Sequence, residues 1–400
     1  MHQSDGMASL PPARRRRLRT WAPTPHSTND EGRLRAVSSD GNDPGLRDLA
    51  SNDYLNLARH PALLEAAGAA MHEQGVGSGG SRLVSGSRPV HQQLEADLST
   101  WLGWQRVLLF PSGFQANLAA VSALADRHTT VLADRLIHHS LLVGVQASGA
   151  RLKRFAHNDL NHLERHLQQV RTNRPNQPLL VLSESLFSME GTSPDLAGLS
   201  ALCSRFHAQL LIDEAHALGV LGPGGRGLTA ALAQPEANAG AGVTMVSGTF
   251  GKAFGSGGAF LACDEALGER LLQTSGAFRY TTALAPPLAA AALAALALIR
   301  SQPHWGQELV AKAEHWRDAI AAAGWPRPGG KGPILPLLVG DDQAALDLQQ
   351  QLEADGVLSI AIRPPTVPEG SARLRLVLHR QQSDDTLALL LRRLKATRHP

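Results

Sequence analysis

The sequence predicts an α/β protein in which a large domain, built on a mostly parallel sheet, precedes a smaller α+β domain. Apolar strand-like runs alternate with helix-like stretches from residue 105 to residue 212, which is typical of parallel sheets with helices on both faces. After Pro286 this alternation stops, and long helical stretches with a few separated strands follow. We therefore expect a 1–50 segment of helix and linker, a 51–286 large domain and a 287–400 smaller domain.

The composition of the 400-residue chain is that of an ordinary globular protein, with 43% hydrophobic and 18% charged residues. A formal net charge of +3 and 4% aromatic residues do not favour a nucleic-acid surface, which needs positive charge and stacking side chains. The basic run at residues 14–17 is interpreted as a solvated helix face, with a nucleic-acid arm or a contact to an acidic carrier protein as alternatives. Cys203 and Cys263 lie in apolar stretches, which indicates reduced packing residues and neither a disulfide nor a metal site.

Two features bear on location. The first residues lack the apolar core of a secretory signal, so we expect a cytoplasmic protein. The longest apolar stretch, residues 283–299, is marginal in length for a membrane span and has two prolines near its start. Because proline suits the first turn of a helix, we predict a buried helix there and no membrane association.

The elements expected before Pro286 follow from local pattern. The predicted helices have apolar residues at helical spacing, and several begin at proline or end at glycine. They cover residues 13–20, 61–74, 89–103, 159–171 and 196–207. The predicted strands are short apolar runs bounded by turn residues. They cover residues 46–51, 105–110, 130–133, 151–155, 178–183, 209–212 and 242–246.

The last third of the chain reads differently. Long helical stretches are expected over residues 287–320, with further helices over 343–353 and 383–395. Strands are expected over residues 334–339, 358–362 and 373–378. Between the last two strands, the sequence RPPTVP at residues 363–368 predicts a rigid turn, because its prolines fix the backbone around Arg363.

Lys252 is the first candidate for chemistry. It lies in SGTFGKAFGSGG, a stretch of small residues and two phenylalanines that follows a predicted buried strand. A lysine that is partly desolvated loses its proton more readily, and its free amine is a nucleophile that can carry an aldehyde cofactor. A surface turn with a lysine that reaches into solvent could have the same sequence.

Asp213 and His216 form the second candidate, in the sequence LLIDEAH. Asp213 is expected at the carboxyl end of a buried parallel strand, the edge at which ligands bind in open α/β sheets. A carboxylate there suits the protonated ring nitrogen of pyridoxal phosphate. Taken alone, Asp-x-x-His would equally be a helix cap or a metal pair, but a lysine loop follows 36 residues after His216.

Two further loops resemble anion sites. Ser112, Gly113 and Phe114 connect a predicted strand to an alanine-rich helix, so free amides and the positive helix end meet there. The glycine cluster GVGSGGS at residues 75–81 is either a second anion cradle or a flexible turn. His138 and Ser188 also follow predicted strands, so they are expected at the same sheet edge as Asp213.

With these residues identified, the chain resembles the α-oxoamine synthases, pyridoxal-phosphate enzymes of the aspartate-aminotransferase fold type. The resemblance runs from about Leu18 to the end of the chain. It is carried, in order, by SNDYLNL, GSGGSRLVSG, PSGFQAN, DRLIHHS, RFAHND, ESLFSMEG, DEAH, GPGGRG, TFGKAFG and IRPPTVP. One departure is Ala217-Leu218 after DEAH, where the family often has His-Gly or His-Ser.

The resemblance implies pyridoxal 5'-phosphate as cofactor and assigns roles to single residues. Lys252 matches the lysine that forms the Schiff base, and Asp213 matches the partner of the ring nitrogen. His138 matches the histidine on the ring face, and His216 the partner of the ring hydroxyl. The remaining matches are Ser188 beside the ring, Gly113, Phe114 and Thr249 at the phosphate, and Thr281 and Thr282 at the phosphate of the other subunit.

The resemblance also implies the reaction. The turn IRPPTVP followed by ARLRL favours the member that condenses L-alanine with a pimeloyl thioester, carried on coenzyme A or on an acyl carrier protein, with loss of carbon dioxide. Arg363 matches the clamp for the alanine carboxylate, Thr366 a substrate contact and Arg19 an acyl-substrate residue. A homodimer with shared active sites is implied, and the alternatives are a sister synthase that uses glycine or serine and a non-catalytic subunit of this fold.

Overall fold

The computed structural model describes residues 10–24, 32–37, 45–232 and 242–397. These residues divide into two compact units. The larger unit holds Leu55–Ser188 and Thr192–Gln307, and the smaller holds the chain up to Tyr54, Met189–Gly191 and the chain from Glu308 onward. The division after Gln307 differs from the expected boundary at 286, because helix α10 (Pro286–Ser301) packs on α2 and α3 of the larger unit.

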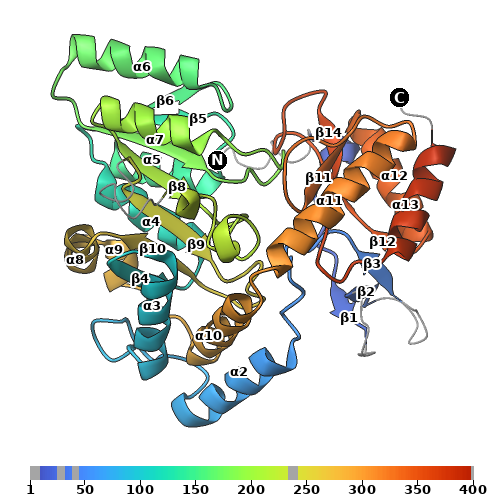
Figure 1. Cartoon of the computed structure of the whole chain (residues 1–400), viewed down its shortest axis with the longest axis horizontal. Helices are drawn as coiled ribbons and strands as arrows, with labels where there is room; N and C mark the ends of the chain where they lie inside the picture. The colour runs from blue at the N-terminus through green and yellow to red at the C-terminus, as the bar shows by residue number, and fades with distance from the viewer. Residues whose placement is uncertain (1–9, 25–31, 38–44, 233–241, 398–400) are drawn as a thin grey trace, which may run out of the picture. The chain divides into compact units, whose positions relative to one another are not determined.

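A seven-stranded sheet organises the larger unit (Figure 1). Its strand order is β4 (Arg106–Phe110), β10 (Ala259–Cys263), β9 (Met245–Thr249), β8 (Gln209–Asp213), β7 (Leu179–Glu184), β5 (Thr130–Asp134) and β6 (Arg151–Phe155). From β9 to β6 the neighbours pair in parallel, whereas β10 is antiparallel to both β9 and β4. The predicted, mostly parallel sheet is confirmed.

Helices lie on both faces of this sheet, as the buried strands require. The unit contains α2 (Pro61–Gln74), α3 (Pro89–Leu102), α4 (Gly113–Leu124), α5 (His139–Ser148), α6 (Leu160–Asn173), α7 (Leu196–Arg205), α8 (Glu265–Thr274), α9 (Gly276–Arg279) and α10. The alanine-rich stretch forms α10 with prolines in its first turn, and most of its alanines are buried, so the prediction of a buried helix is confirmed. No helix among the described residues is long and apolar enough to cross a membrane.

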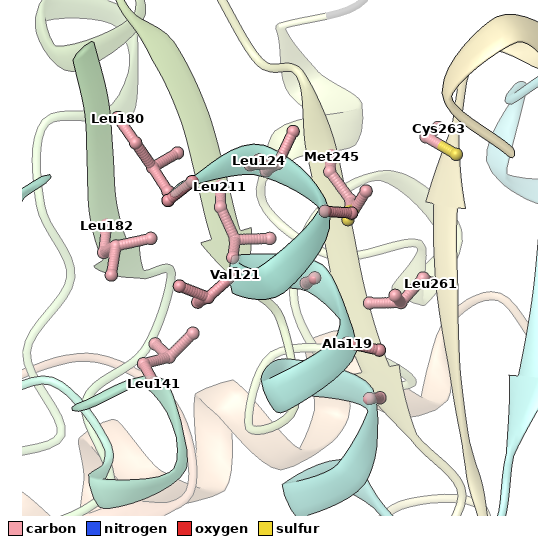
Figure 2. Close-up of a cluster of buried hydrophobic side chains, with 14 of the residues drawn as sticks. Ala119, Val121, Leu124, Leu141, Leu180, Leu182, Leu211, Met245, Leu261 and Cys263 are labelled. Atoms are coloured by element: carbon pink, nitrogen blue, oxygen red, sulfur yellow. The ribbon is translucent and has the colours of Figure 1, made fainter. Parts of the chain in front are cut away.

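The core on one face of the sheet gathers around α4. Figure 2 shows Val121 and Leu124 of this helix beside Leu211 and Met245 from neighbouring strands. The strand side chains alternate between faces, so Val181 and Ile212 point to the opposite core, where they meet Leu163 of α6 and residues of α7. Two separate apolar cores therefore fix the strands and leave their carboxyl ends for polar side chains.

The smaller unit contains two sheets. An antiparallel sheet has the order β11 (Ile334–Gly340), β14 (Ala372–Val377) and β13 (Ile360–Ile362). A second sheet has the order β1 (Trp21–Pro23), β2 (Arg33–Ala36), β3 (Leu46–Asp48) and β12 (Val357–Leu358). The helices are α12 (Asp342–Ala354) and α13 (Asp384–Ala396), and α11 (Trp305–Ala322) begins in the larger unit and continues into the smaller one.

Several predicted elements were wrong. The helix expected over residues 13–20 is a three-residue turn, η1 (Pro12–Arg14), followed by chain outside any helix or strand, because Arg14 and Arg19 pair with carboxylates elsewhere in the smaller unit. The strand expected over 358–362 is split at the buried Ser359, and its two halves join different sheets. The helical stretches expected over 287–320 are present as α10 and α11, with Pro303 between them. Strands β1, β2 and β10 were not predicted.

Candidate active site

A cavity of about 210 Å³ lies at the carboxyl ends of the parallel strands in the larger unit. Strands β7, β8 and β9 contribute their last residues, the first turns of α4 form one side, and the segments after β5, β8 and β9 contribute the rest. The cavity brings together seven residues that the sequence singled out: Gly113, Phe114, His138, Asp213, His216, Thr249 and Lys252.

The start of α4 forms one wall of the cavity. Ser112 caps the helix by accepting a hydrogen bond from the amide of Gln115 at 3.3 Å. Because the first amides of a helix have no intrahelical acceptor, those of Gly113 and Phe114 lie at the positive helix end. Thr249 lies opposite, and its hydroxyl donates to the carbonyl of Gly258 at 3.0 Å. This wall suits a phosphate group.

Asp213 is held as an acceptor at the end of β8. Only 6% of its surface is exposed. Its Oδ1 accepts the amide of Ala215 at 2.9 Å, and its Oδ2 accepts Nδ2 of Asn117 at 2.7 Å. Both bonds fix the orientation of the carboxylate, which can accept a hydrogen bond from a protonated ring nitrogen.

His138 begins helix α5 and faces the same cavity. Its amide donates to Oε1 of the buried Glu184 at 2.6 Å. Burial lowers the pKa of His138, the Lys252 ammonium and His139 lower it further, and Asp213 opposes them. The imidazole is therefore neutral at pH 7.

Lys252 lies in the loop between β9 and β10, whose shape is set by buried phenylalanines. Phe250 and Phe254 are fully buried, and the amide of Gly255 donates to the carbonyl of Lys252 at 2.8 Å. Gly255 has a φ of +60°, and a side chain there would collide with the backbone of Ala58, so this turn requires glycine. The loop thus presents Lys252 from a rigid frame rather than from a flexible surface turn.

Three other predicted residues of the larger unit lie outside the cavity lining. Ser188 is half buried and follows β7 by four residues. Thr281 is half buried and Thr282 is exposed, in the turn after α9. Their exposure leaves both threonines accessible to another molecule.

The predicted substrate residues lie in the smaller unit, around a hollow of about 660 Å³ that Arg19, Arg363 and Thr366 line together with other arginines. Arg19 makes a two-bond ion pair with Glu353, at 2.6 and 2.8 Å. Arg16 contributes Nη2, which donates to the carbonyl of Arg363 at 3.1 Å. Residues 15–17 of the arginine run are exposed, as a solvated face would be, although Arg14 and Arg16 also bond to other parts of the smaller unit.

A structural ion pair with Glu369 or Asp355 would be the alternative use of Arg363, but both carboxylates accept other arginines. Glu369 accepts Arg14, and Asp355 accepts Arg393. Arg363 is 8% exposed, and its Nε is buried without a partner among the described residues. An arginine in this state has donor capacity left for an anionic ligand.

Three residues of the site were missed by sequence reasoning. Asn117 and Glu184 line the cavity, and Ser140 bonds to His138. Asn117 follows Gly113 by four residues, so helical spacing would have placed both on one face. Glu184 is the last residue of a strand, the position from which Asp213 had been identified.

The residue set fits pyridoxal phosphate. A helix amino end with a facing threonine provides for the phosphate, the buried Asp213 for the ring nitrogen and Lys252 for the aldehyde. The described residues gather no cluster of three His, Cys, Asp or Glu side chains that would hold a metal ion.

Comparisons with known proteins agree with this geometry. The family model described as aminotransferase class I and II matches residues 45–394. A curated protein of Nitrosococcus oceani, named 8-amino-7-oxononanoate synthase, is 44% identical over 87% of this chain and 90% of its own length. The solved serine palmitoyltransferase of Sphingomonas wittichii superposes with a TM-score of 0.83 at 27% identity, covering 89% of this chain and 88% of its own. The solved 8-amino-7-oxononanoate synthase of Francisella tularensis gives 0.72 at 27% identity, covering 88% and 97%.

Proposed function

The chain belongs to the class I and II aminotransferase family, and we propose that it condenses L-alanine with a pimeloyl thioester to give 8-amino-7-oxononanoate. Carbon dioxide and the free thiol of the acyl carrier are the other products. The observation that carries the proposal is one cavity that holds Lys252, Asp213 and His138 at the strand ends. The curated relatives that match most of the chain, at 40–44% identity, carry the name of this synthase.

The enzyme depends on pyridoxal phosphate, as the family and the solved neighbours with that cofactor indicate. When bound, the cofactor supplies an aldehyde and an electron-withdrawing ring that stabilises a carbanion at the α carbon of an amino acid. Gly113, Phe114 and Thr249 would hold its phosphate at the start of α4. His216 would bind the ring hydroxyl, and Ser188 would lie beside the ring.

Asp213 maintains the charge that this chemistry needs. Its carboxylate is buried and accepts bonds from Asn117 and from a backbone amide. These bonds orient the carboxylate, so that it would hold the proton on the ring nitrogen by a charge-assisted hydrogen bond. His138 would cover the ring face and exclude water from it.

Lys252 has two tasks. Its Nζ would carry the cofactor aldehyde while the enzyme waits for substrate, and alanine would displace it. The free amine then takes the α proton of alanine, acting as a general base, and returns a proton to the same carbon after decarboxylation. The rigid loop around Phe250 and Gly255 fixes the reach of Nζ.

Arg363 would grip the alanine carboxylate in two parallel hydrogen bonds. Support comes from its burial, its partnerless Nε and the occupation of nearby carboxylates by other arginines. Thr366 would contact the substrate in the same hollow. Arg19 would bind the acyl substrate. Because Arg19 pairs with Glu353, it would have to leave this carboxylate to reach the substrate.

A second copy of the chain is the proposed partner. Phe114, Val84 and Tyr280 are large apolar side chains with 45%, 82% and 80% of their surface exposed. Their segments are linked, because Gln115 donates to the carbonyl of Ala277 and the amide of Ala283 donates to that of Gly80. A homodimer that covers this area would bring the half-buried Thr281 and the exposed Thr282 to the phosphate of the neighbouring subunit.

The second candidate is a sister synthase that takes glycine or serine. It is favoured by the superposition on a serine palmitoyltransferase, whose TM-score of 0.83 exceeds the 0.72 of the solved oxononanoate synthase. Against it stands the identity of 27% to that protein, compared with 44% to the curated oxononanoate synthase.

The experiment is a product assay on purified protein loaded with pyridoxal phosphate. Alanine, glycine and serine are each supplied with pimeloyl-coenzyme A or pimeloyl-acyl carrier protein, and the product is identified by mass spectrometry. We expect 8-amino-7-oxononanoate from alanine and no turnover with the Lys252→Ala variant. Faster product formation from glycine or serine with another acyl thioester would replace the proposal by its alternative. Steady-state constants with the two donors identify the natural carrier.

A further inference from the structure

A chain of hydrogen bonds joins Asp213 to His138 inside the larger unit. Asn117 donates through Nδ2 to Oδ2 of Asp213 at 2.7 Å and to Oγ of Ser140 at 2.9 Å. Ser140 Oγ lies 2.7 Å from Nδ1 of His138, and the Ser140 amide donates to the same nitrogen at 3.3 Å. Above, Asn117 serves only to orient Asp213, and Ser140 has no part in the reaction.

Two groups set the donor and acceptor of every hydrogen bond in this series: the Asp213 carboxylate at one end and the Ser140 backbone amide at the other. The ionised Asp213 can only accept, so the Asn117 side chain must present its NH₂ group to it. That group has a second hydrogen, which goes to Ser140 Oγ. The Ser140 oxygen accepts this hydrogen, so its own proton is directed to Nδ1 of His138. The Ser140 backbone amide, which can only donate, requires the same bare Nδ1.

Burial makes this arrangement specific. Asn117, Ser140 and Asp213 have exposures of 3%, 0% and 6%, so solvent offers little replacement for a missing bond. Oδ1 of Asn117 is buried and has no partner among the described residues. An asparagine that leaves its oxygen unpaired while using both amide hydrogens is oriented by its acceptors.

The charges around His138 agree with a neutral ring. Lys252 and His139 disfavour a cation there, Asp213 favours one, and the buried Glu184 accepts the backbone amide of His138. Desolvation is the largest influence, and it lowers the pKa. A neutral imidazole still has two tautomers, and the hydrogen bonds at Nδ1 choose between them.

We propose that Asn117 and Ser140 are positioning residues that hold His138 as the tautomer with its proton on Nε2. These hydrogen bonds link the carboxylate assigned to the cofactor ring nitrogen with the histidine assigned to the ring face. The role in turnover rests on the proposed function, whereas the tautomer itself is a property of the protein alone. With Nδ1 fully used, Nε2–H is the group that His138 can offer to a substrate oxygen.

The test is nitrogen-15 NMR of the histidine rings, because chemical shifts separate protonated from bare imidazole nitrogens. The His138 signals are assigned by their loss in His138→Gln, in both cofactor-free and cofactor-loaded protein. In the wild type we expect a bare Nδ1 and a protonated Nε2 at pH 7.5. Ser140→Ala and Asn117→Ala break different links, and each should increase the Nδ1–H tautomer and raise the pKa of His138 toward that of a free histidine. The hydroxyl-retaining Ser140→Thr should keep the wild-type tautomer.

The second measurement is steady-state kinetics, which gives kcat and the KM for alanine. Losing one buried hydrogen bond should lower kcat about tenfold in Ser140→Ala while the KM for alanine changes less than about twofold. Ser122→Ala is the matched control, since Ser122 is an exposed serine on the same helix as Asn117. It should leave both the NMR signals and kcat unchanged.

The outcomes separate this inference from the function. A wild-type protein with its His138 proton on Nδ1 overturns the inference, even if the product assay succeeds. Variants that fold, as judged by circular dichroism, and keep the Nε2–H tautomer also overturn it. The predicted tautomer and its loss in both variants, together with a failed product assay, would support the inference and remove the proposed function instead.

Discussion

Nη1 of Arg363 donates a hydrogen bond to the backbone carbonyl oxygen of Ala13. A neutral carbonyl on the amino-terminal segment thus uses one donor of the arginine that we assign to the substrate carboxylate. The Nε atom of the same side chain is buried without a partner among the described residues. A carboxylate replacing the carbonyl would gain a charge-assisted bond and engage a second donor.

Arg363→Ala should therefore raise the KM for alanine sharply and slow α-proton exchange, with a smaller effect on cofactor affinity. Arg363→Lys keeps the charge but loses the planar fork, so it should be impaired as well. Steady-state kinetics and deuterium exchange at the α carbon measure the two effects. Arg327→Ala, at an exposed arginine paired with Glu314 and Asp318, is the control and should leave both unchanged. A normal alanine KM in Arg363→Ala would remove this residue from the site.

Asp213→Asn should lower kcat/KM by several orders of magnitude while the fold persists. The substitution removes a buried charge, and breaking one side of a buried ion pair costs about 3–5 kcal/mol. Asp195→Asn is the control, because Asp195 caps α7 on the surface and asparagine caps equally well. A Asp213→Asn enzyme within tenfold of wild type would mean that another group holds the ring nitrogen.

The sequence predicted the parallel strands of the larger unit because each signal for them is local. The apolar run before Asp213 and the glycines around Lys252 act within a few residues, and both residues line the cavity as expected. The alternation of strands and helices likewise predicted the parallel part of the sheet.

What the sequence could not predict depends on distant partners. The run at residues 14–17 was read as a helix, but Arg14 pairs with carboxylates more than 300 residues away. Asn117 is an ordinary helix residue until the fold brings Asp213 to it. Strand β10 is a short apolar run whose antiparallel place between β4 and β9 is a matter of sheet order.

The dimer proposal predicts complementation between two inactive variants. One carries Lys252→Ala, and the other carries Thr281→Ala with Thr282→Ala. If these threonines serve the neighbouring subunit, mixed dimers contain one complete site and should regain a fraction of wild-type activity. Activity is measured after the two proteins are unfolded, mixed and refolded, with mixed dimers verified by mass. Mixed dimers without any regained activity would show that each site is built from one chain.

His91 predicts a pH dependence of stability. It is fully buried, its Nε2 lies 2.8 Å from the carbonyl of Leu284, and its Nδ1 accepts the amide of Arg88 at 3.1 Å. Burial, followed by Arg82, lowers its pKa in the folded state. The unfolded chain therefore binds the proton more tightly, so this contribution is present above the unfolded pKa of about 6.5 and is lost as pH falls through the lower folded value.

Urea unfolding at pH 7.5 and pH 5.5 tests this. The free energy of unfolding should be lower at pH 5.5, and His91→Gln should reduce the difference between the two pH values, since glutamine does not titrate. An unchanged difference in a folded His91→Gln protein would assign the effect to other groups.

Borohydride reduction followed by peptide mapping shows directly whether Lys252 holds the cofactor aldehyde. Reduction makes the bond between the lysine amine and the cofactor permanent, and mass spectrometry of the digest locates the added group. We expect the pyridoxyl group on Lys252 alone and no labelled peptide from Lys252→Ala. The chain has four other lysines, at positions 153, 312, 331 and 395. Stoichiometric label on any of them, with Lys252 unmodified, would mean that another lysine holds the cofactor aldehyde.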